Sequence, residues 1–250
     1  MALKEEFEKQ GLWLFRYRGV LPVFILFIGF LLFVYTELHP ETFFIKNSPY
    51  EIYFEMGCLL LGLFGLFIRI CVIGFTPKNT SGRTVKNQVA DTLNTKGIYS
   101  LVRHPLYLGN YFMWLAPAML SGNFWFVVAF TLSYWLYYER IMYAEEQFLR
   151  NKFGLVYEDW ANQVPAFIPD FKSFIKADLS FSWKKVVRKE ITGIFVLFAI
   201  FFAFDYVGVY LKNEEAPNPF LLYSMIFLLI AIAVIKIIKK KTDWLKQENR

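Results

Sequence analysis

Six long apolar runs alternate with polar segments along this chain, over residues 19–35, 52–75, 106–120, 124–143, 191–211 and 220–238. A helix needs about 20 mainly apolar residues to cross roughly 30 Å of hydrocarbon, and most of these runs are close to that length. The run 106–120 is short, unless the polar residues before it continue the same helix. Because only Ser121, Gly122 and Asn123 separate it from the next run, the two runs predict a helical hairpin.

The composition agrees with a membrane protein. Of the 250 residues, 56% are hydrophobic and 29 are Phe, more than a soluble domain of this size needs for its core. The predicted fold class is therefore all-α, a polytopic membrane protein of about six transmembrane helices that forms a single domain over residues 1–250. The first run is expected to be retained, since mostly polar residues precede it and no small-residue cleavage site follows it.

Basic residues are distributed unevenly among the predicted loops. They gather before residue 19, in 76–104, in 139–190 and after residue 235, whereas the remaining loops hold only Lys46 and Lys212. By the positive-inside rule, both termini and the long loops are expected on the cytoplasmic side. The stretch 171–190 mixes aromatic residues with Lys and Arg, which predicts a segment lying on anionic headgroups.

A polar cluster at the start of the third run is the first candidate for chemistry. Pro105 suits the first turn of a helix, where its missing N–H costs nothing. Arg103 and His104 would then lie at the helix N-terminus, where unpaired backbone N–H groups attract a carboxylate or phosphate. Within the next two turns follow an aromatic hydroxyl, a glycine and an amide, namely Tyr107, Gly109 and Asn110.

A second cluster lies at the end of the fourth run. If that helix continues past the apolar residues, Glu139, Tyr143 and Glu146 share one face of it, with Arg140 and Glu145 beside them. A carboxylate there would hold a ligand ammonium or ribose hydroxyls and offset the charge of a sulfonium. Each cluster has a simpler explanation, since basic residues before a helix often anchor it to headgroups, and a Glu pair after a helix is often solvated.

Other polar residues suggest packing more than chemistry. Arg69, near the end of the second run, is expected to snorkel to the interface, and Asp205 to have a packing partner. Cys58 and Cys71 are too far apart on one helix for a disulfide. The two histidines, His39 and His104, are expected on opposite sides of the membrane, so no metal site is predicted. Nothing in the sequence points to nucleic acid as a partner.

Read together, the two clusters carry a family resemblance. The stretch 97–110 resembles the pattern G-x-Y-x-x-x-R-H-P-x-Y-x-G of the isoprenylcysteine carboxyl methyltransferase and phospholipid methyltransferase superfamily of integral-membrane methyltransferases. Residues 145–149, 153–157 and 164–169 are similar to its tail, E-E-x-x-L, F-G-x-x-Y and V-P-x-x-I-P. The resemblance covers residues 76–170, a methyltransferase signature region, and leaves residues 191–250 as a C-terminal two-helix addition.

The resemblance implies an S-adenosylmethionine-dependent methyltransferase at the cytoplasmic face, acting on a lipid-linked acceptor that enters from the bilayer. It also implies that the segment near Val164 and Pro165 covers the cofactor. The residues expected at the cofactor are Arg103, His104, Tyr107, Gly109, Asn110, Glu145 and Glu146.

The acceptor is open at this stage. The net charge of +6 favours an anionic group, such as a lipid A phosphate or a prenylcysteine carboxylate, and Arg140 would position it through bidentate contacts. Arg69 and Arg83 are further candidates for holding an anion. N-methylation of an aminophospholipid, with Glu139 taking the proton, is an alternative. An NADPH-dependent sterol-type reductase and a non-enzymatic membrane protein are the others.

Overall fold

The computed structural model describes residues 2–78, 80, 88–213 and 216–245. Within these ranges the chain is helical, with α1 Leu3–Tyr17, α2 Leu21–Leu38, α3 Glu51–Phe75, α4 Pro105–Leu120, α5 Phe124–Phe153, α6 Leu155–Gln163, α7 Trp183–Lys212 and α8 Pro219–Lys241. Three short 3-10 turns, η1 Pro40–Thr42, η2 Ile98–Ser100 and η3 Phe171–Ser173, lie in the connections. The all-α prediction is confirmed, and each apolar run coincides with one of the long helices.

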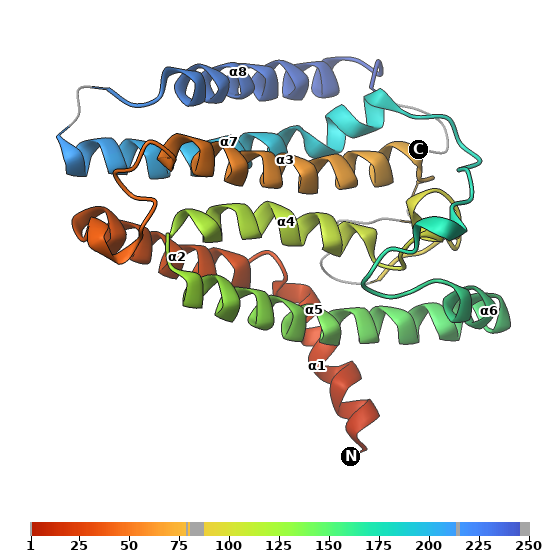
Figure 1. Ribbon diagram of the computed structural model, residues 1–250. Coiled ribbons are helices and arrows are strands. Elements are labelled where there is room, and N and C mark those ends of the chain that lie inside the picture. The colour runs from red at the N-terminus through yellow and green to blue at the C-terminus, as the bar shows by residue number, and fades with distance from the viewer. Residues whose placement is uncertain (1, 79, 81–87, 214–215, 246–250) are drawn as a thin grey trace.

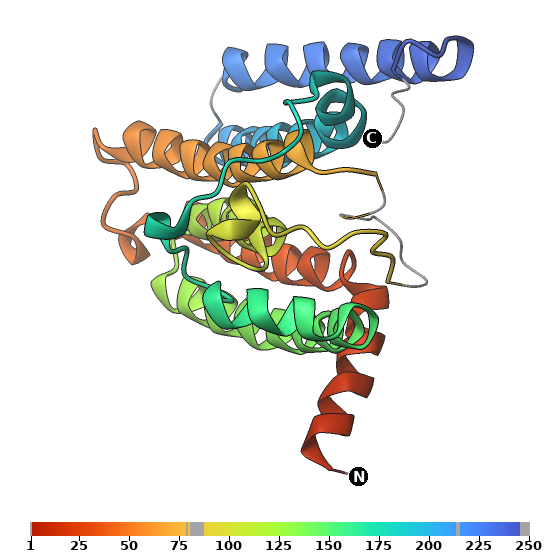
Figure 2. The ribbon, with the colours of Figure 1, turned by 90° about the vertical axis from the view of Figure 1, so that its right-hand side faces the viewer.

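The long helices lie in stacked layers and alternate in direction (Figure 1). Helix α4 packs against α3, α5 and α2, while α7 packs against α3 and α8. Helix α1 packs on α5 and points away from the stack (Figure 2). The start of α4 and the end of α5 therefore lie at the same end of the bundle, as the sequence predicted for its two polar clusters.

Among the described residues, three helices, α3, α7 and α8, are long and apolar enough to cross a membrane, and the bent pair α1–α2 would be a fourth. Helix α4 has only 16 residues, or about 24 Å of rise, which is short of the hydrocarbon thickness. Helix α5 has 30 residues, or about 45 Å of rise, and ends in a charged segment. Six crossings thus remain a prediction.

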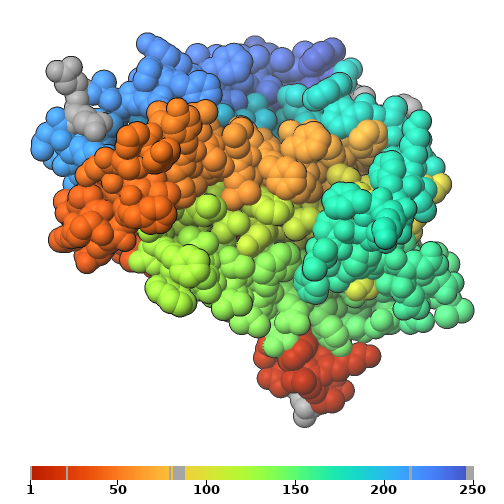
Figure 3. Space-filling view, viewed as in Figure 1, coloured from red at the N-terminus to blue at the C-terminus, as the bar shows by residue number. Residues whose placement is uncertain are grey.

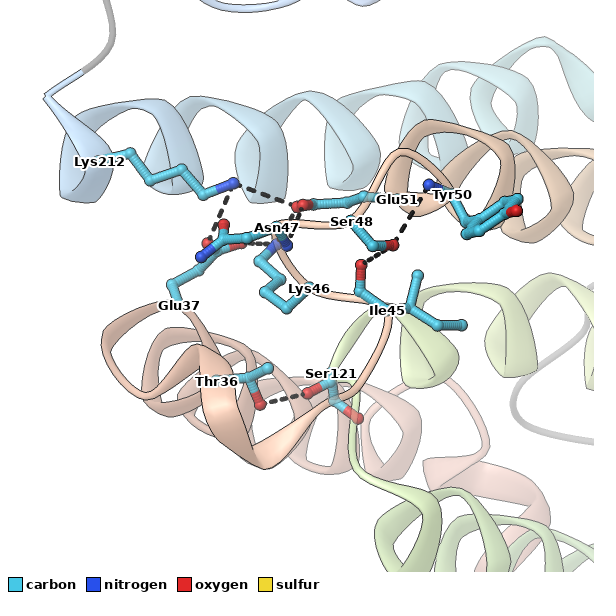
Figure 4. A network of polar contacts seen from close by, with 10 residues as sticks. All are labelled: Thr36, Glu37, Ile45, Lys46, Asn47, Ser48, Tyr50, Glu51, Ser121 and Lys212. Carbon is cyan, nitrogen blue, oxygen red and sulfur yellow. Dashed lines mark hydrogen bonds and ion pairs between the residues drawn. The ribbon is translucent and has the colours of Figure 1, made fainter.

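The α4–α5 hairpin forms where the sequence predicted it. Gly122 has a φ of +66°, in the region that favours glycine, and the Asn123 side chain accepts a hydrogen bond from the Phe126 N–H at 2.9 Å. That bond caps α5. Ser121 has no exposed surface, and its carbonyl accepts a hydrogen bond from the Thr36 hydroxyl, which fixes the turn against α2 (Figure 4).

An ion cluster closes the same end of the bundle. Lys46 bonds to both Glu37 and Glu51, and Lys212 from the end of α7 bonds to Glu51 at 3.1 Å (Figure 4). These side chains are largely buried. The cluster links α2, α3 and α7 at the end of the bundle opposite the start of α4. Asp205, expected to have a packing partner, accepts a hydrogen bond from the Asn218 N–H at 2.7 Å, just before α8.

Helices α3 and α4 approach closely through two glycines. A Cβ on Gly65 would lie 2.4 Å from the Gly109 carbonyl oxygen, and one on Gly109 would lie 2.8 Å from the Gly65 oxygen. Small residues of this kind let the backbones of membrane helices touch. Gly109 therefore shapes the contact between α3 and α4 directly behind the start of α4.

Substitution of Gly65 tests this contact. Gly65→Ala should lower the free energy of unfolding by about 1–3 kcal/mol, because the added methyl group has to push two backbones apart. Gly57→Ala is the matched control on the same helix, since a Cβ there meets nothing within 4 Å. Thermal unfolding in detergent measures both, and equal melting temperatures for the two variants would contradict the close approach.

Candidate functional site

A cavity of about 470 Å³ lies at the end of the bundle where α4 begins. This volume is within the range of about 300–1,000 Å³ that small-molecule sites occupy. One part of its wall is polar, with Arg18, Arg69, Arg103, His104, Tyr107, Asn110 and Glu145. Another part is apolar, with Met113 and Trp114 from α4 and Val196, Leu197 and Ile200 from α7. The cavity therefore joins a charged end to an apolar end.

His104 is fixed at the N-terminus of α4. It is the N-cap residue, Pro105 follows in the first turn, and its carbonyl accepts from the N–H groups of Tyr107 and Leu108. Its ring, only 7% exposed, lies 2.8 Å from Glu146 through Nε2 and stacks on Tyr107. Since Glu146 itself lies outside the cavity wall, it acts on the cavity by holding the imidazole.

Glu145 reaches the cavity from the neighbouring position on α5. Its Oε2 accepts a hydrogen bond from the Tyr107 hydroxyl at 2.9 Å and lies 3.9 Å from His104 Nδ1. Tyr107 is held in turn by the Tyr134 hydroxyl, which donates to its backbone carbonyl at 2.7 Å. A carboxylate is thus presented to the cavity by side chains from two helices, where it would favour a cationic ligand or bind ligand hydroxyls.

The chain after α6 covers the loop that precedes α4 (Figure 3). The Arg103 N–H donates to the Pro165 carbonyl at 2.9 Å, and the Asp170 N–H donates to the Leu101 carbonyl at 2.9 Å. The Gly97 N–H bonds to the Ile175 carbonyl in an isolated bridge. These strand-like contacts hold the covering segment over the start of α4.

Two buried donors point to a ligand. Gln88 and Trp160 line the cavity. Their side-chain nitrogens, Gln88 Nε2 and Trp160 Nε1, are buried, and neither has a hydrogen-bond partner among the described residues. A buried polar group without a partner costs free energy, so such donors usually meet a ligand or water. Both would be satisfied by a molecule rich in acceptors.

Comparison with known proteins bears on what this cavity is. The family model described as phospholipid methyltransferase matches residues 54–155, which include both polar clusters. Over this region the chain is similar to the isoprenylcysteine carboxyl methyltransferase and phospholipid methyltransferase superfamily. No solved structure matches it.

Several curated members of the superfamily are similar to this chain. A protein-S-isoprenylcysteine O-methyltransferase of Schizosaccharomyces pombe is 42% identical over 78 residues, 31% of this chain and 33% of that protein. The enzyme of the same name from Xenopus laevis is 32% identical over 116 residues, 46% of this chain and 40% of its own. Methanethiol S-methyltransferase 2 of Bradyrhizobium diazoefficiens is 32% identical over 108 residues, which are 43% of this chain and 36% of that protein. The chain thus spans well under half the length of these relatives.

The structure brings together most of the residues that the sequence placed at the cofactor. Arg103, His104, Tyr107, Asn110 and Glu145 line the cavity. Two others lie behind its wall, where Gly109 contacts α3 and Glu146 binds His104 and lies 3.4 Å from Arg103 Nε.

The two residues predicted to act on the acceptor lie elsewhere. Glu139 is exposed, and the Arg140 guanidinium lies 3.3 Å from the centre of the Phe7 ring on α1, so neither lines the cavity. The reason is the direction of each side chain on α5, since Tyr137, Tyr138 and Ile141 occupy its buried face. This arrangement gives no support to a catalytic role for Glu139 or Arg140.

Arg69 also differs from its prediction. Its guanidinium donates two hydrogen bonds, from Nε and Nη2, to the Glu190 carboxylate of α7, so it does not snorkel to the interface. Arg83, the other candidate for holding an anion, lies outside the described residues. Sequence reasoning missed Gln88, Trp160 and Glu190; for Glu190, a carboxylate immediately before an apolar run was the available signal.

Glu146 provides a pH test of the site. Burial opposes its ionisation, but the hydrogen bond from His104 and the charges of His104 and Arg103 outweigh burial, so the pKa of Glu146 lies below the ordinary 4.5. A carboxyl group whose pKa is lower in the folded state stabilises that state at every pH above its pKa in the unfolded chain. This stabilisation is lost as the pH falls through its pKa in the folded state.

The difference in melting temperature between the wild type and Glu146→Gln should therefore shrink as the pH falls below the ordinary carboxyl value of 4.5. Thermal unfolding of both proteins across a pH series measures it. A difference that is the same at every pH would show that the ionised carboxylate contributes nothing to the pair.

Proposed function

We propose that this protein is an S-adenosylmethionine-dependent membrane methyltransferase that methylates an anionic group on a lipid-linked acceptor, preferably a prenylcysteine carboxylate. The observation that carries the proposal is the joining of a charged end, with His104 and Glu145, to an apolar end within one cavity of a helical bundle. The names of the similar isoprenylcysteine O-methyltransferases support the same acceptor class.

The residues of the cavity fit S-adenosylmethionine. Glu145 offers a carboxylate to ribose hydroxyls or to the cationic part of the molecule, while Gln88 Nε2 and Trp160 Nε1 offer unpaired donors to its acceptor atoms. Burial and the nearby Glu146 raise the pKa of Tyr157, so its hydroxyl stays neutral in the cavity wall.

When bound, the cofactor would supply an activated methyl group, whose bond to sulfur breaks as an acceptor oxygen bonds to the methyl carbon. This chemistry asks little of side chains beyond alignment and the exclusion of water. The segment held over the start of α4 by the Arg103–Pro165 hydrogen bond would shield the charged end from solvent. A carboxylate acceptor is already a nucleophile, so no general base is required.

The apolar end of the cavity supports a lipid-linked acceptor. Met113, Trp114, Val196, Leu197 and Ile200 would receive a hydrocarbon chain. Arg18, at the end of α1, lines the same cavity and is the candidate to hold the anionic group in place of Arg140. A guanidinium binds carboxylate oxygens through two parallel hydrogen bonds.

We further propose that the bundle crosses the membrane six times, with the cavity and both termini on the cytoplasmic side. The alternating helix directions and the excess of basic residues in the loops at the cavity end support this topology. Cysteine labels at Asn47 and Asn162 should then react from opposite sides of the membrane, and labelling from one side would overturn the six-span topology.

A thiol acceptor is the second candidate, favoured by the similarity to a methanethiol S-methyltransferase.

The experiment that tests these acceptors is a transfer assay with methyl-labelled S-adenosylmethionine and full-length protein in detergent. The acceptors are N-acetyl-S-farnesylcysteine, its carboxamide, phosphatidylethanolamine and an alkyl thiol. A base-labile methyl ester on the first acceptor alone is expected. Label on the amine or the thiol would show that the acceptor is not a carboxylate. Thermal stabilisation of the protein by NADPH but not by S-adenosylhomocysteine would overturn the proposed methyltransferase activity.

A further inference from the structure

A buried ion pair joins α3 to α7 beside the cavity. Arg69 Nε donates to Glu190 Oε2 at 2.8 Å, and Nη2 donates to Glu190 Oε1 at 2.7 Å. Glu190 is 0% exposed, whereas Arg69 lines the cavity. Glu190 lies outside the family match, which covers residues 54–155 and includes Arg69, so the pair links the C-terminal helices to the matched region.

Arg69 passes this contact on to α4 and α5. Its Nη1 donates to Asn110 Oδ1, and the Asn110 side chain lies near the Tyr138 hydroxyl. The Tyr138 ring stacks on Tyr134, with centroids 4.2 Å apart. A continuous series of polar and ring contacts therefore runs from Glu190 into the core of the bundle.

The series ends at the carboxylate of the cavity. Tyr134 donates to the Tyr107 backbone carbonyl, and the Tyr107 hydroxyl donates to Glu145. Asn110 and Tyr107 lie on the same helix and both line the cavity, so the orientation of this wall depends on the contacts behind it. Support from behind is what holds a binding residue in its productive geometry.

We propose that Glu190 is a positioning residue for the cofactor site and acts through Arg69 on Asn110. This inference rests on the proposed function. Glu190 does two things in it: it fixes the guanidinium that orients the Asn110 amide, and it neutralises a positive charge that would otherwise repel a sulfonium. Helix α7 thereby completes the site, in addition to forming its apolar wall.

The alternative is an ion pair that only holds α3 and α7 together, since buried pairs are often replaced without loss of function. The chain offers a matched control for this case. Glu51, on the same α3, bonds to Lys212 of the same α7 at the opposite end of the helices, and to Lys46 (Figure 4). Loss of either carboxylate breaks an α3–α7 ion pair, but only Glu190 leads to the cavity.

The test uses full-length protein in detergent and S-adenosylhomocysteine as the probe, titrated by calorimetry well below the melting temperature. Glu190→Gln should raise the Kd about tenfold, since it removes a charged hydrogen-bonding partner. Glu190→Asp, which keeps the charge, should recover part of the affinity. Glu51→Gln should lower the melting temperature and leave the Kd at the wild-type value.

Each outcome decides. Wild-type affinity in Glu190→Gln, or an equal loss in Glu51→Gln, would overturn the positioning role while leaving the proposed function intact. Failure of the wild type to bind the probe would overturn the proposed function, and the inference with it. If Glu190→Gln does not fold, Glu190→Asp carries the test, and wild-type affinity in that variant would overturn the role.

Discussion

Replacing Glu145 with Gln should weaken the binding of S-adenosylhomocysteine by about ten- to a hundredfold. The carboxylate lines the cavity, and the Tyr107 hydroxyl holds it in place. A hydrogen bond to a charged group contributes about 1.5–3 kcal/mol, and every 1.4 kcal/mol is a factor of about ten in affinity. Isothermal titration of the purified variant measures the loss.

Two further variants serve as the control and as a second test of the cavity. Glu158→Gln is the control, because Glu158 lies on the adjoining α6, is 44% exposed and bonds only to Arg150 in the described structure; its affinity should be that of the wild type. His104→Ala should resemble Glu145→Gln, since it removes part of the cavity wall. If Glu145→Gln and His104→Ala both bind like the wild type, the ligand lies elsewhere.

The helices could be predicted from sequence because each depends on local information. Apolar runs define membrane helices, since every backbone group must be satisfied within the segment. Pro105 marked the start of α4, and Ser121, Gly122 and Asn123 marked the turn before α5. Helix α7, however, begins at Trp183, eight residues before the apolar run at residue 191, because its first turns are polar yet bury Glu190 and Lys185 against α3.

The site was predictable only in part. His104, Tyr107 and Glu145 lie in short signature segments at the ends of two helices joined by a tight hairpin, and this topology alone brings them together. Trp160 and Glu190 join them through tertiary packing. Trp160 depends on the turn at Gly154, with a φ of +56°, and Glu190 depends on α7 lying against α3.

The direction of side chains on α5 was the weakest inference. Periodicity placed Glu139, Tyr143 and Glu146 on one face, but it could not say which face meets α4. Helix α1 decides this, because Gly11 lies against the Arg140 carbonyl and Phe7 contacts the Arg140 guanidinium. The packing of the N-terminal residues on α5 had no sequence signal that distinguished it from a solvated segment.

The same geometry makes the acceptor testable. Arg18→Gln should raise the acceptor KM by about ten- to a hundredfold, with the Kd for S-adenosylhomocysteine near the wild-type value, because the guanidinium would contact the acceptor carboxylate and not the cofactor. Arg18 lines the cavity, and its guanidinium also lies 3.9 Å from the centre of the Phe15 ring. The measurement is the rate of methyl ester formation on N-acetyl-S-farnesylcysteine at varied acceptor concentration.

Arg140→Gln is the matched comparison, since Arg140 is an arginine of the same end of the bundle that lies outside the cavity wall. It should retain the wild-type KM. A raised KM in Arg140→Gln with no change in Arg18→Gln would return the acceptor to the residue that the sequence favoured. If neither variant changes the KM, neither Arg18 nor Arg140 holds the acceptor, and the proposed role of Arg18 is wrong. An amine or thiol acceptor, which needs no bidentate partner, would then gain support.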